Sequence, residues 1–180
     1  MTTWKFGIIG TGAIAGFHRD AIAELPDAVV ASVAGRHPDK TAAFAASCGC
    51  EGTTDYRRLL ERGDIDIVCV TTRSGSHARI GEDVLRAGKH LIVEKPLAMK
   101  AGEAERLVRL ADGEGLALSV ISQRRFEPHM ASLQRLIADG KLGKLLLLEA
   151  GTPYYRTQDY YDAAEWRGTI AEDGGALMNQ

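Results

Sequence analysis

The sequence lacks a long apolar run, a signal peptide and any block of like charge. No apolar stretch approaches the roughly 20 residues of a membrane helix, and the opening Met1 to Ile9 has no basic segment followed by a long apolar stretch. Basic residues alternate with acidic ones, and the formal net charge is -2. These absences predict a cytoplasmic protein that binds neither membranes nor nucleic acid.

Cysteine is also scarce, with three in 180 residues: Cys48, Cys50 and Cys69. An odd number of cysteines in a chain without an export signal favours buried thiols over a disulfide framework. Cys48 and Cys50 are too close for a C-x-x-C redox motif, and no His or Cys group converges on them, so no metal site is expected. The composition, 45% hydrophobic and 26% charged, is that of an ordinary globular protein.

Short runs rich in Val and Ile alternate with longer stretches rich in Ala and Leu, which is typical of βαβ units. The expected strands are 5–10, 29–34, 65–70, 90–93 and 116–121, and the expected helices are 13–25, 38–47, 55–61, 76–87, 101–112 and 128–138. The strands show little alternation of apolar and polar residues, as in a sheet buried on both faces. The predicted fold class is therefore α/β, a Rossmann doubly wound parallel sheet.

After Ile121 the pattern changes. A polar segment leads into the helix 128–138, and residues 142–149 contain five Leu and are predicted to form a strand. The remaining residues are rich in aromatics, glycine and charge, have no clear period, and stop without a closing element. We therefore expect a dinucleotide-binding domain over residues 1–122 and the start of an α+β substrate and oligomerisation domain over 123–180, apparently cut short.

A G-x-G-x-x-A pattern lies between the first expected strand and the first expected helix. In such a pattern Gly10 permits a tight turn, Gly12 lets the backbone approach a pyrophosphate, and Ala15 allows close packing of helix and strand. The helix N-terminus then attracts the anion. The alternative is a turn that merely needs small residues. The residues predicted to contact a dinucleotide are Gly10, Thr11, Gly12, Ala13 and Ile14.

The second expected strand is followed by Gly35-Arg36-His37, where NAD-binding chains usually carry an acid for the ribose hydroxyls. Arg36, with Lys40 one turn on, has the fork geometry that suits a 2′-phosphate, and Gly35 removes a repelling carboxylate. This favours NADP, with NAD as the other possibility. In the alternative interpretation Arg36 is a solvated loop residue.

Lys95 follows the expected strand 90–93, at the carboxyl edge of the sheet where folds of this class bind ligands. A lysine in this place can exchange a proton with a substrate hydroxyl. The residues alone leave open a surface lysine paired with a carboxylate.

Hydroxyl groups follow the expected strand 65–70 as well. Thr71, Thr72 and Ser74 can form hydrogen bonds with the nicotinamide ribose, and His77, which opens the next helix, is expected at the cofactor as well. Ser74 or Ser76 as a helix cap would explain part of the segment without a cofactor. His18 lies among apolar residues of the first helix and is interpreted as a structural histidine.

Taken together these motifs resemble the Gfo/Idh/MocA family of oxidoreductases, and the likeness extends over essentially the whole chain. The segments that carry it are Gly7-Ile8-Ile9-Gly10-Thr11-Gly12-Ala13-Ile14-Ala15, Ala87-Gly88-Lys89-His90, Glu94-Lys95-Pro96, Gln123-Arg124-Arg125-Phe126 and Trp166-Arg167-Gly168. The resemblance implies hydride transfer between NAD(P) and a CH–OH carbon of a sugar, polyol or related cyclic alcohol. It also implies that Lys95 relays the proton and contacts the nicotinamide ribose, with Glu94 and Pro96 shaping its loop and Glu94 among the residues at the cofactor.

By the same resemblance, Gln123 is expected at the cofactor, while Arg125, Trp166 and Asn179 are expected on the substrate side. A full-length protein of this kind would be a homo-oligomer. The sequence departs from the family pattern at Asn179, where an Asp is frequent, and it stops before the expected histidine. Arg73 and Ser74 replace a frequent proline and asparagine. A second hypothesis follows: a dinucleotide-binding sensor or scaffold without chemistry, or an inactive fragment of the enzyme.

Overall fold

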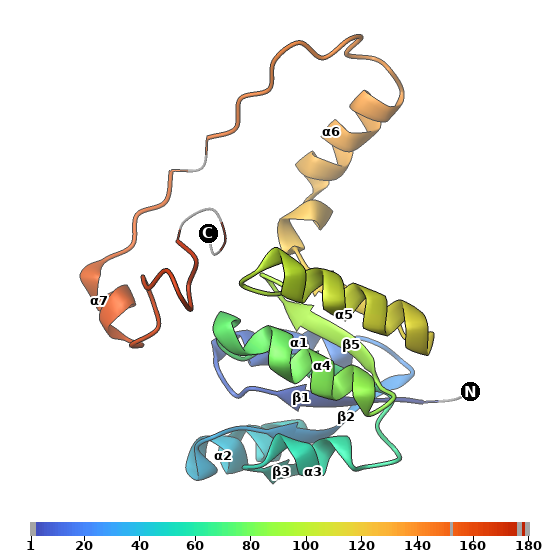
Figure 1. Ribbon diagram of the computed structural model, residues 1–180, viewed down its shortest axis with the longest axis vertical. Coiled ribbons are helices and arrows are strands. Elements are labelled where there is room, and N and C mark those ends of the chain that lie inside the picture. The colour runs from blue at the N-terminus through green and yellow to red at the C-terminus, as the bar shows by residue number, and fades with distance from the viewer. Residues whose placement is uncertain (1–2, 152, 176–177, 179–180) are drawn as a thin grey trace.

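The computed structural model describes residues 3–151, 153–175 and 178, and its centre is one parallel sheet of six strands (Figure 1). The strands are β1 (Trp4–Ile9), β2 (Ala28–Ala34), β3 (Glu51–Thr53), β4 (Ile67–Val70), β5 (His90–Glu94) and β6 (Leu118–Ile121). Their order is β3-β2-β1-β4-β5-β6, and every neighbouring pair is parallel. This is the predicted doubly wound Rossmann sheet, with its switch point between β1 and β4.

Helices connect the strands and continue beyond the sheet. They are α1 (Ala13–Ala23), α2 (Pro38–Cys48), α3 (Tyr56–Leu60), α4 (His77–Arg86), α5 (Ala101–Glu114), α6 (Pro128–Ala138) and α7 (Gln158–Asp162), with 3-10 turns at Ser74–Ser76 and Gln123–Phe126. The six predicted helices are confirmed with ends shifted by a few residues, whereas β3 and α7 were not predicted. None of the helices in the described residues is long and apolar enough to cross a membrane.

The core has two layers, one on each face of the sheet. On one face α1 and α2 pack over Phe6, Ile8 and Val33, and on the other α3, α4 and α5 pack over Val68 and Leu91. Neighbouring residues of one strand enter opposite layers, so both faces need apolar side chains. This explains the unbroken Val and Ile runs of the sequence. It also leaves only the strand ends and the loops that follow them free for polar chemistry.

The cysteines lie within this arrangement as free thiols. Cys69 on β4 is buried, and burial raises the pKa of its thiol to about 12. Cys48 and Cys50 are partly exposed, and burial also raises the pKa of Cys50, to about 11. The expectation of a buried thiol is therefore confirmed for Cys69 only.

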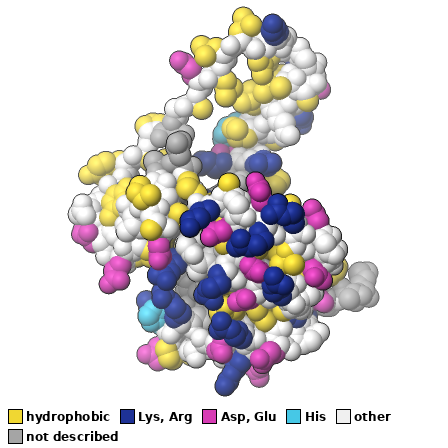
Figure 2. All heavy atoms as spheres, viewed as in Figure 1, with side chains coloured by type: hydrophobic (Ala, Val, Ile, Leu, Met, Phe, Trp, Pro, Cys, Tyr) yellow, Lys and Arg dark blue, Asp and Glu magenta, His cyan; other side chains and the backbone are white. Residues whose placement is uncertain are grey.

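The predicted strand over residues 142–149 is wrong. The chain runs there as an extended segment outside the sheet, with Leu146 and Leu148 at 86% and 71% exposure. A strand needs the backbone hydrogen bonds of a neighbour, and no strand among the described residues pairs with this segment. Figure 2 shows hydrophobic side chains gathered over α6 and the chain that follows it, in contrast to the mixed charges over the sheet domain.

Candidate functional site

The predicted glycine turn lies at the carboxyl end of β1, in the middle of the sheet. Gly10 has a φ of 115°, and its N–H donates to the Ala34 carbonyl at 2.8 Å. A Cβ built on Gly10 would lie 2.7 Å from the Thr71 carbonyl oxygen, so both conformation and space require glycine. The Thr71 hydroxyl in turn donates to the carbonyls of Ile9 and Gly10, at 3.1 and 3.3 Å. Thr71 thus fixes the turn from the neighbouring strand.

The N-terminus of α1 opens directly after this turn. Gly12 is the N-cap residue and supplies no side-chain hydrogen bond to the first helical turn. A Cβ on Gly12 would meet nothing within 4 Å, and both Gly12 and Ala13 are exposed. Ala15, by contrast, is fully buried against the sheet. The helix therefore presents uncapped backbone N–H groups and their partial positive charge to an open space, which fits a pyrophosphate.

At the end of β2, the structure gives a packing reason for Gly35. A Cβ there would lie 2.5 Å from Thr41 Oγ1 and 2.7 Å from Thr11 Cγ2, so any side chain would displace the glycine turn or α2. Arg36 and Lys40 follow on the surface, both exposed. Arg36 forms no ion pair with the residues the structure describes. Its guanidinium is thus available for an anionic ligand.

The loop after β4 is tied together by its own polar groups. The hydroxyls of Thr72 and Ser76 are 2.8 Å apart, and Ser76 Oγ donates to the Arg73 carbonyl at 2.8 Å. Ser76 is the N-cap residue of α4 but makes no capping hydrogen bond with its side chain, and Ser74 is buried in the 3-10 turn. Ser76 is therefore the cap residue by position, as the alternative interpretation has it, but its hydroxyl closes the loop and does not bond the first helical turn.

His77 links this loop to the one after β5. Its side chain is buried, with Nε2 2.9 Å from the Thr72 carbonyl oxygen and Nδ1 2.8 Å from the Pro96 carbonyl oxygen. Both ring nitrogens face backbone acceptors, which leaves neither for a nucleotide. The predicted direct contact of His77 with a cofactor thus has an alternative in the structure, a link between two loops.

The Glu94-Lys95-Pro96 segment forms the carboxyl end of β5 and the loop after it. Glu94 is only 6% exposed, and its Oε1 accepts a hydrogen bond from His18 Nε2 on α1 at 3.0 Å. This confirms the interpretation of His18 as a structural histidine. Lys95 itself is half-buried, and the Lys95–Pro96 peptide bond is cis.

Lys89 is a buried residue whose role the sequence reasoning missed. Its ammonium donates to the carbonyls of Arg62 and Ile65 at 2.7 and 2.9 Å, and burial lowers its pKa. These carbonyls belong to the turn between α3 and β4, so Lys89 fixes the entry to the central strand. The available signal was its place in the Ala87-Gly88-Lys89-His90 motif, directly before a buried strand.

Residues beyond the sheet approach the site from the last part of the chain. Arg73 Nε forms an ion pair with Glu172 Oε2 at 3.2 Å, and Glu172 lies against Gly75. The segment that follows α7 therefore contacts the loop after β4, and the ribbon shows this segment on the same side as the start of α4 (Figure 1). Trp166 is partly buried in this segment.

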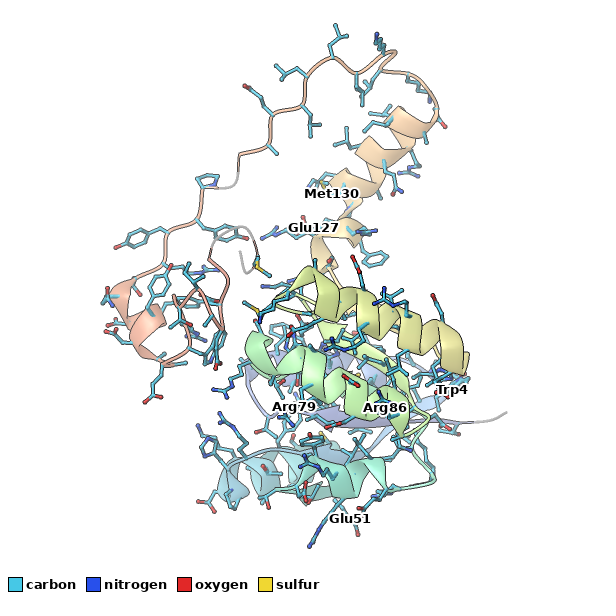
Figure 3. The ribbon with its side chains drawn as sticks, in the orientation of Figure 1. Trp4, Glu51, Arg79, Arg86, Glu127 and Met130 are labelled. Atoms are coloured by element: carbon cyan, nitrogen blue, oxygen red, sulfur yellow. The ribbon has the colours of Figure 1, made fainter. Side chains whose placement is uncertain are left out.

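The remaining predicted residues lie in different parts of the chain. Gln123 and Arg125 lie exposed in the 3-10 turn that follows β6. The chain then continues to Glu127, the N-cap residue of α6, and to Met130 within that helix (Figure 3). Asn179 is outside the described residues. The structure thus brings together the glycine turn, the loop after β4 and Lys95, because β1, β4 and β5 are adjacent in the sheet.

Comparison with known proteins identifies the family that shares this fold and site. The model of the Gfo/Idh/MocA oxidoreductase family, NAD-binding Rossmann fold, matches residues 4–122. An inositol 2-dehydrogenase from Rhizobium meliloti is 32% identical over 143 residues, which are 79% of this chain and 43% of the relative. The chain spans less than half the length of the curated relatives it matches.

Solved structures give the same result over a longer stretch. The WlbA dehydrogenase from Bordetella pertussis, in complex with NADH and UDP-GlcNAcA, superposes with a TM-score of 0.96 at 32% identity, covering 100% of this chain and 54% of that one. KijD10, a 3-ketoreductase from Actinomadura kijaniata in complex with NADP, has a TM-score of 0.73 at 32% identity and covers 79% of this chain and 46% of its own. The chain belongs to the Gfo/Idh/MocA family of oxidoreductases with an NAD-binding Rossmann fold.

Proposed function

We propose that the protein is an oxidoreductase that moves a hydride between NADP and a CH–OH carbon of a sugar, polyol or related cyclic alcohol. The observation that carries this proposal is that Lys95, the glycine turn and the loop after β4 follow three successive strands of the sheet and lie at the same carboxyl edge. Ligands of doubly wound sheets bind at such carboxyl ends. The related inositol dehydrogenase and the nucleotide-sugar complex of WlbA support the substrate class.

The chain's residues divide the work between binding and proton transfer. The turn from Gly10 to Gly12 and the first residues of α1 would hold the pyrophosphate, and the loop that begins at Thr71 would face the nicotinamide ribose. When bound, the cofactor supplies the hydride chemistry. Lys95 takes the hydroxyl proton of the substrate during oxidation, as the C–O bond becomes a carbonyl, and returns it during reduction.

The test of the catalytic assignment is Lys95→Met in the full-length protein, assayed with myo-inositol and with UDP-GlcNAcA. We expect turnover to fall by about 10²- to 10⁴-fold, because general acid–base catalysis contributes that much. Binding of NADPH, followed by its fluorescence, should persist. Lys100→Met is the matched control, since Lys100 is an exposed residue in the same loop region. Unchanged turnover in Lys95→Met would remove Lys95 from the mechanism.

NADP is preferred over NAD in this proposal because Arg36 is exposed and unpaired among the described residues at the end of β2. The relatives do not decide the matter, since WlbA was crystallised with NADH and KijD10 with NADP. Titration of the full-length protein with both reduced cofactors is the test. Arg36→Gln should weaken NADPH binding by about 10- to 100-fold, the value of one charged hydrogen bond, and leave NADH binding unchanged. Tighter binding of NADH by the wild type would refute the preference.

We also propose a domain boundary at residues 122 and 123, with residues 123–180 belonging to a substrate domain. Both the sheet and the family match end here, at Ile121 and residue 122. Beyond it, α6 exposes Met130, Leu133 and Ile137 along one shallow apolar hollow. Limited proteolysis of the full-length protein should cut between the two parts and release a folded fragment that ends near residue 122.

A further inference from the structure

Two histidines, His77 buried and His18 partly buried, contact the residues on either side of Lys95. His18, from α1, donates to the Glu94 carboxylate, and His77, from the start of α4, contacts the Pro96 carbonyl. Glu94 and Pro96 are the immediate neighbours of Lys95 in the chain. Lys95 thus lies between two residues that imidazole groups from two different helices contact, Glu94 through its carboxylate and Pro96 through its backbone carbonyl.

The chemistry of these contacts makes them directional. A carbonyl oxygen only accepts hydrogen bonds, so a ring nitrogen of His77 that carries a hydrogen donates it to the carbonyl that it faces, Thr72 for Nε2 and Pro96 for Nδ1. The Glu94 carboxylate is likewise an acceptor and is 6% exposed. A buried acceptor that loses its donor keeps the full cost of desolvation, so each contact resists displacement.

The two histidines also connect Lys95 to both halves of the proposed cofactor site. His18 lies on α1, the helix whose N-terminus opens at Gly12. His77 also contacts the carbonyl of Thr72, in the loop after β4. A displacement of α1 or of the loop after β4 would therefore act on the Glu94-to-Pro96 segment directly, through a hydrogen bond.

We infer that His18 and His77 are positioning residues that set the place of Lys95 relative to the cofactor site, one through Glu94 and the other through Pro96. The inference rests on the proposed function, in which Lys95 relays the proton. Neither histidine contacts substrate or cofactor in this scheme. Their effect is on the geometry of proton transfer, where a misplacement of about 1 Å can cost on the order of 100-fold in rate.

Asn and Gln variants of the two histidines distinguish a positioning role from a packing role. The amide nitrogen of Asn lies the same number of bonds from Cα as Nδ1 of His, and that of Gln the same number as Nε2. At position 77, His77→Asn therefore keeps a donor toward Pro96, and His77→Gln keeps one toward Thr72 only. At position 18 the order reverses, because Glu94 is bound through Nε2: His18→Gln keeps the donor and His18→Asn loses it.

The experiment measures kcat and KM of these four variants of the full-length protein, with the substrate that shows turnover in the Lys95→Met comparison. We expect kcat to fall by about 100-fold in His77→Gln and His18→Asn. His77→Asn and His18→Gln should keep kcat within a few-fold of the wild type, and KM should stay constant in all four. His129→Asn and His129→Gln are the matched controls, since His129 is an exposed helical residue.

A second readout needs no substrate. The rate at which acetic anhydride labels Lys95, measured by mass spectrometry against Lys100 as internal standard, reports the surroundings of the amine. It should change in His77→Gln and His18→Asn and match the wild type in the other two. Equal effects of Asn and Gln at both positions, on kcat and on labelling, would overturn the inference and reduce both histidines to packing. Turnover at the wild-type rate in Lys95→Met would instead refute the proton relay by Lys95 in the proposed function, whatever the labelling shows.

Discussion

Replacement of Lys89 by Met tests whether a buried cation, and not only apolar packing, holds the central strand in place. Lys89 is 5% exposed and donates to two carbonyls, those of Arg62 and Ile65. Methionine keeps most of the length of the side chain and removes the ammonium. The two carbonyls then lose a donor, while the other contacts of the side chain are largely retained.

The size of the effect follows from the burial of the two acceptors. The bond to Ile65 is buried, so its carbonyl cannot turn to water and costs about 1–3 kcal/mol when left unsatisfied. The bond to Arg62 is only part-buried, so water replaces much of it. Methionine also avoids the free-energy cost of burying a charged ammonium, which offsets part of the loss. We expect Lys89→Met to lower the free energy of unfolding by about 2 kcal/mol, a sizeable share of the roughly 5–15 kcal/mol of a typical domain.

The same residue predicts a pH dependence. Burial lowers the pKa of Lys89 below its ordinary 10.5, so in the alkaline range the unfolded chain binds more protons at this site than the folded chain. The free energy of unfolding contributed by Lys89 therefore rises with pH, from the lowered pKa up to about 10.5. Other titrating groups act in both proteins and cancel in the difference. The wild type should thus gain stability over Lys89→Met as the pH rises through this window.

Urea denaturation followed by circular dichroism measures both effects. With a slope of about 2 kcal/mol per molar urea, the midpoint should fall by about 1 M at neutral pH, with the slope unchanged. Lys100→Met, an exposed change of the same kind, should stay within about 0.5 kcal/mol. An unchanged midpoint in Lys89→Met would refute the structural role assigned to this ammonium. A stability difference that shrinks as the pH rises would contradict the lowered pKa of Lys89.

Two further predictions concern the neighbouring loops. Gly35→Ala should lower the free energy of unfolding by about 1–3 kcal/mol in urea titrations, because the added methyl overlaps Thr11; wild-type stability would contradict the packing argument. Gly12→Ala should cost less than about 1 kcal/mol but weaken NADPH binding in calorimetry, since its methyl enters the open space before α1. Arg73→Gln removes a half-exposed ion pair and should cost only about 0.2–1 kcal/mol, yet speed hydrogen exchange around Glu172; unchanged exchange there would count against the contact.

The sequence predicted the sheet well where burial dictated residue type. β1, β2 and β4 lie between two layers of helices, and their Val and Ile runs follow from that. β3 escaped prediction because its Glu51–Thr53 sequence is short, sits at the sheet edge and has no apolar run. The leucine-rich segment 142–149 was mistaken for a strand because strand formation depends on a partner, which no local pattern reveals.

Some features of the candidate site could likewise be predicted from the sequence, and others could not. The glycine turn and Lys95 could be placed from the sequence, because each directly follows a buried strand. The bond between His18 and Glu94 could not, since 76 positions separate these residues and only the order of the strands brings them together. The reason for Gly35 was equally hidden: the sequence suggested a charge argument, whereas the structure shows that Thr11 and Thr41 occupy the space of a side chain.

The placement of all six strands before residue 122 has a consequence for how the chain folds during synthesis. β1 cannot acquire its second neighbour until Val70 has left the ribosome, and the sheet is complete once Ile121 has followed. Domains fold as units from the N-terminus as the chain emerges, at about 5–20 residues per second. The leucines from 142 onward then emerge beside a finished sheet. The order of translation thus prevents the exposed leucines of residues 142–148 from pairing with the strands of the nucleotide-binding domain before the sheet is formed.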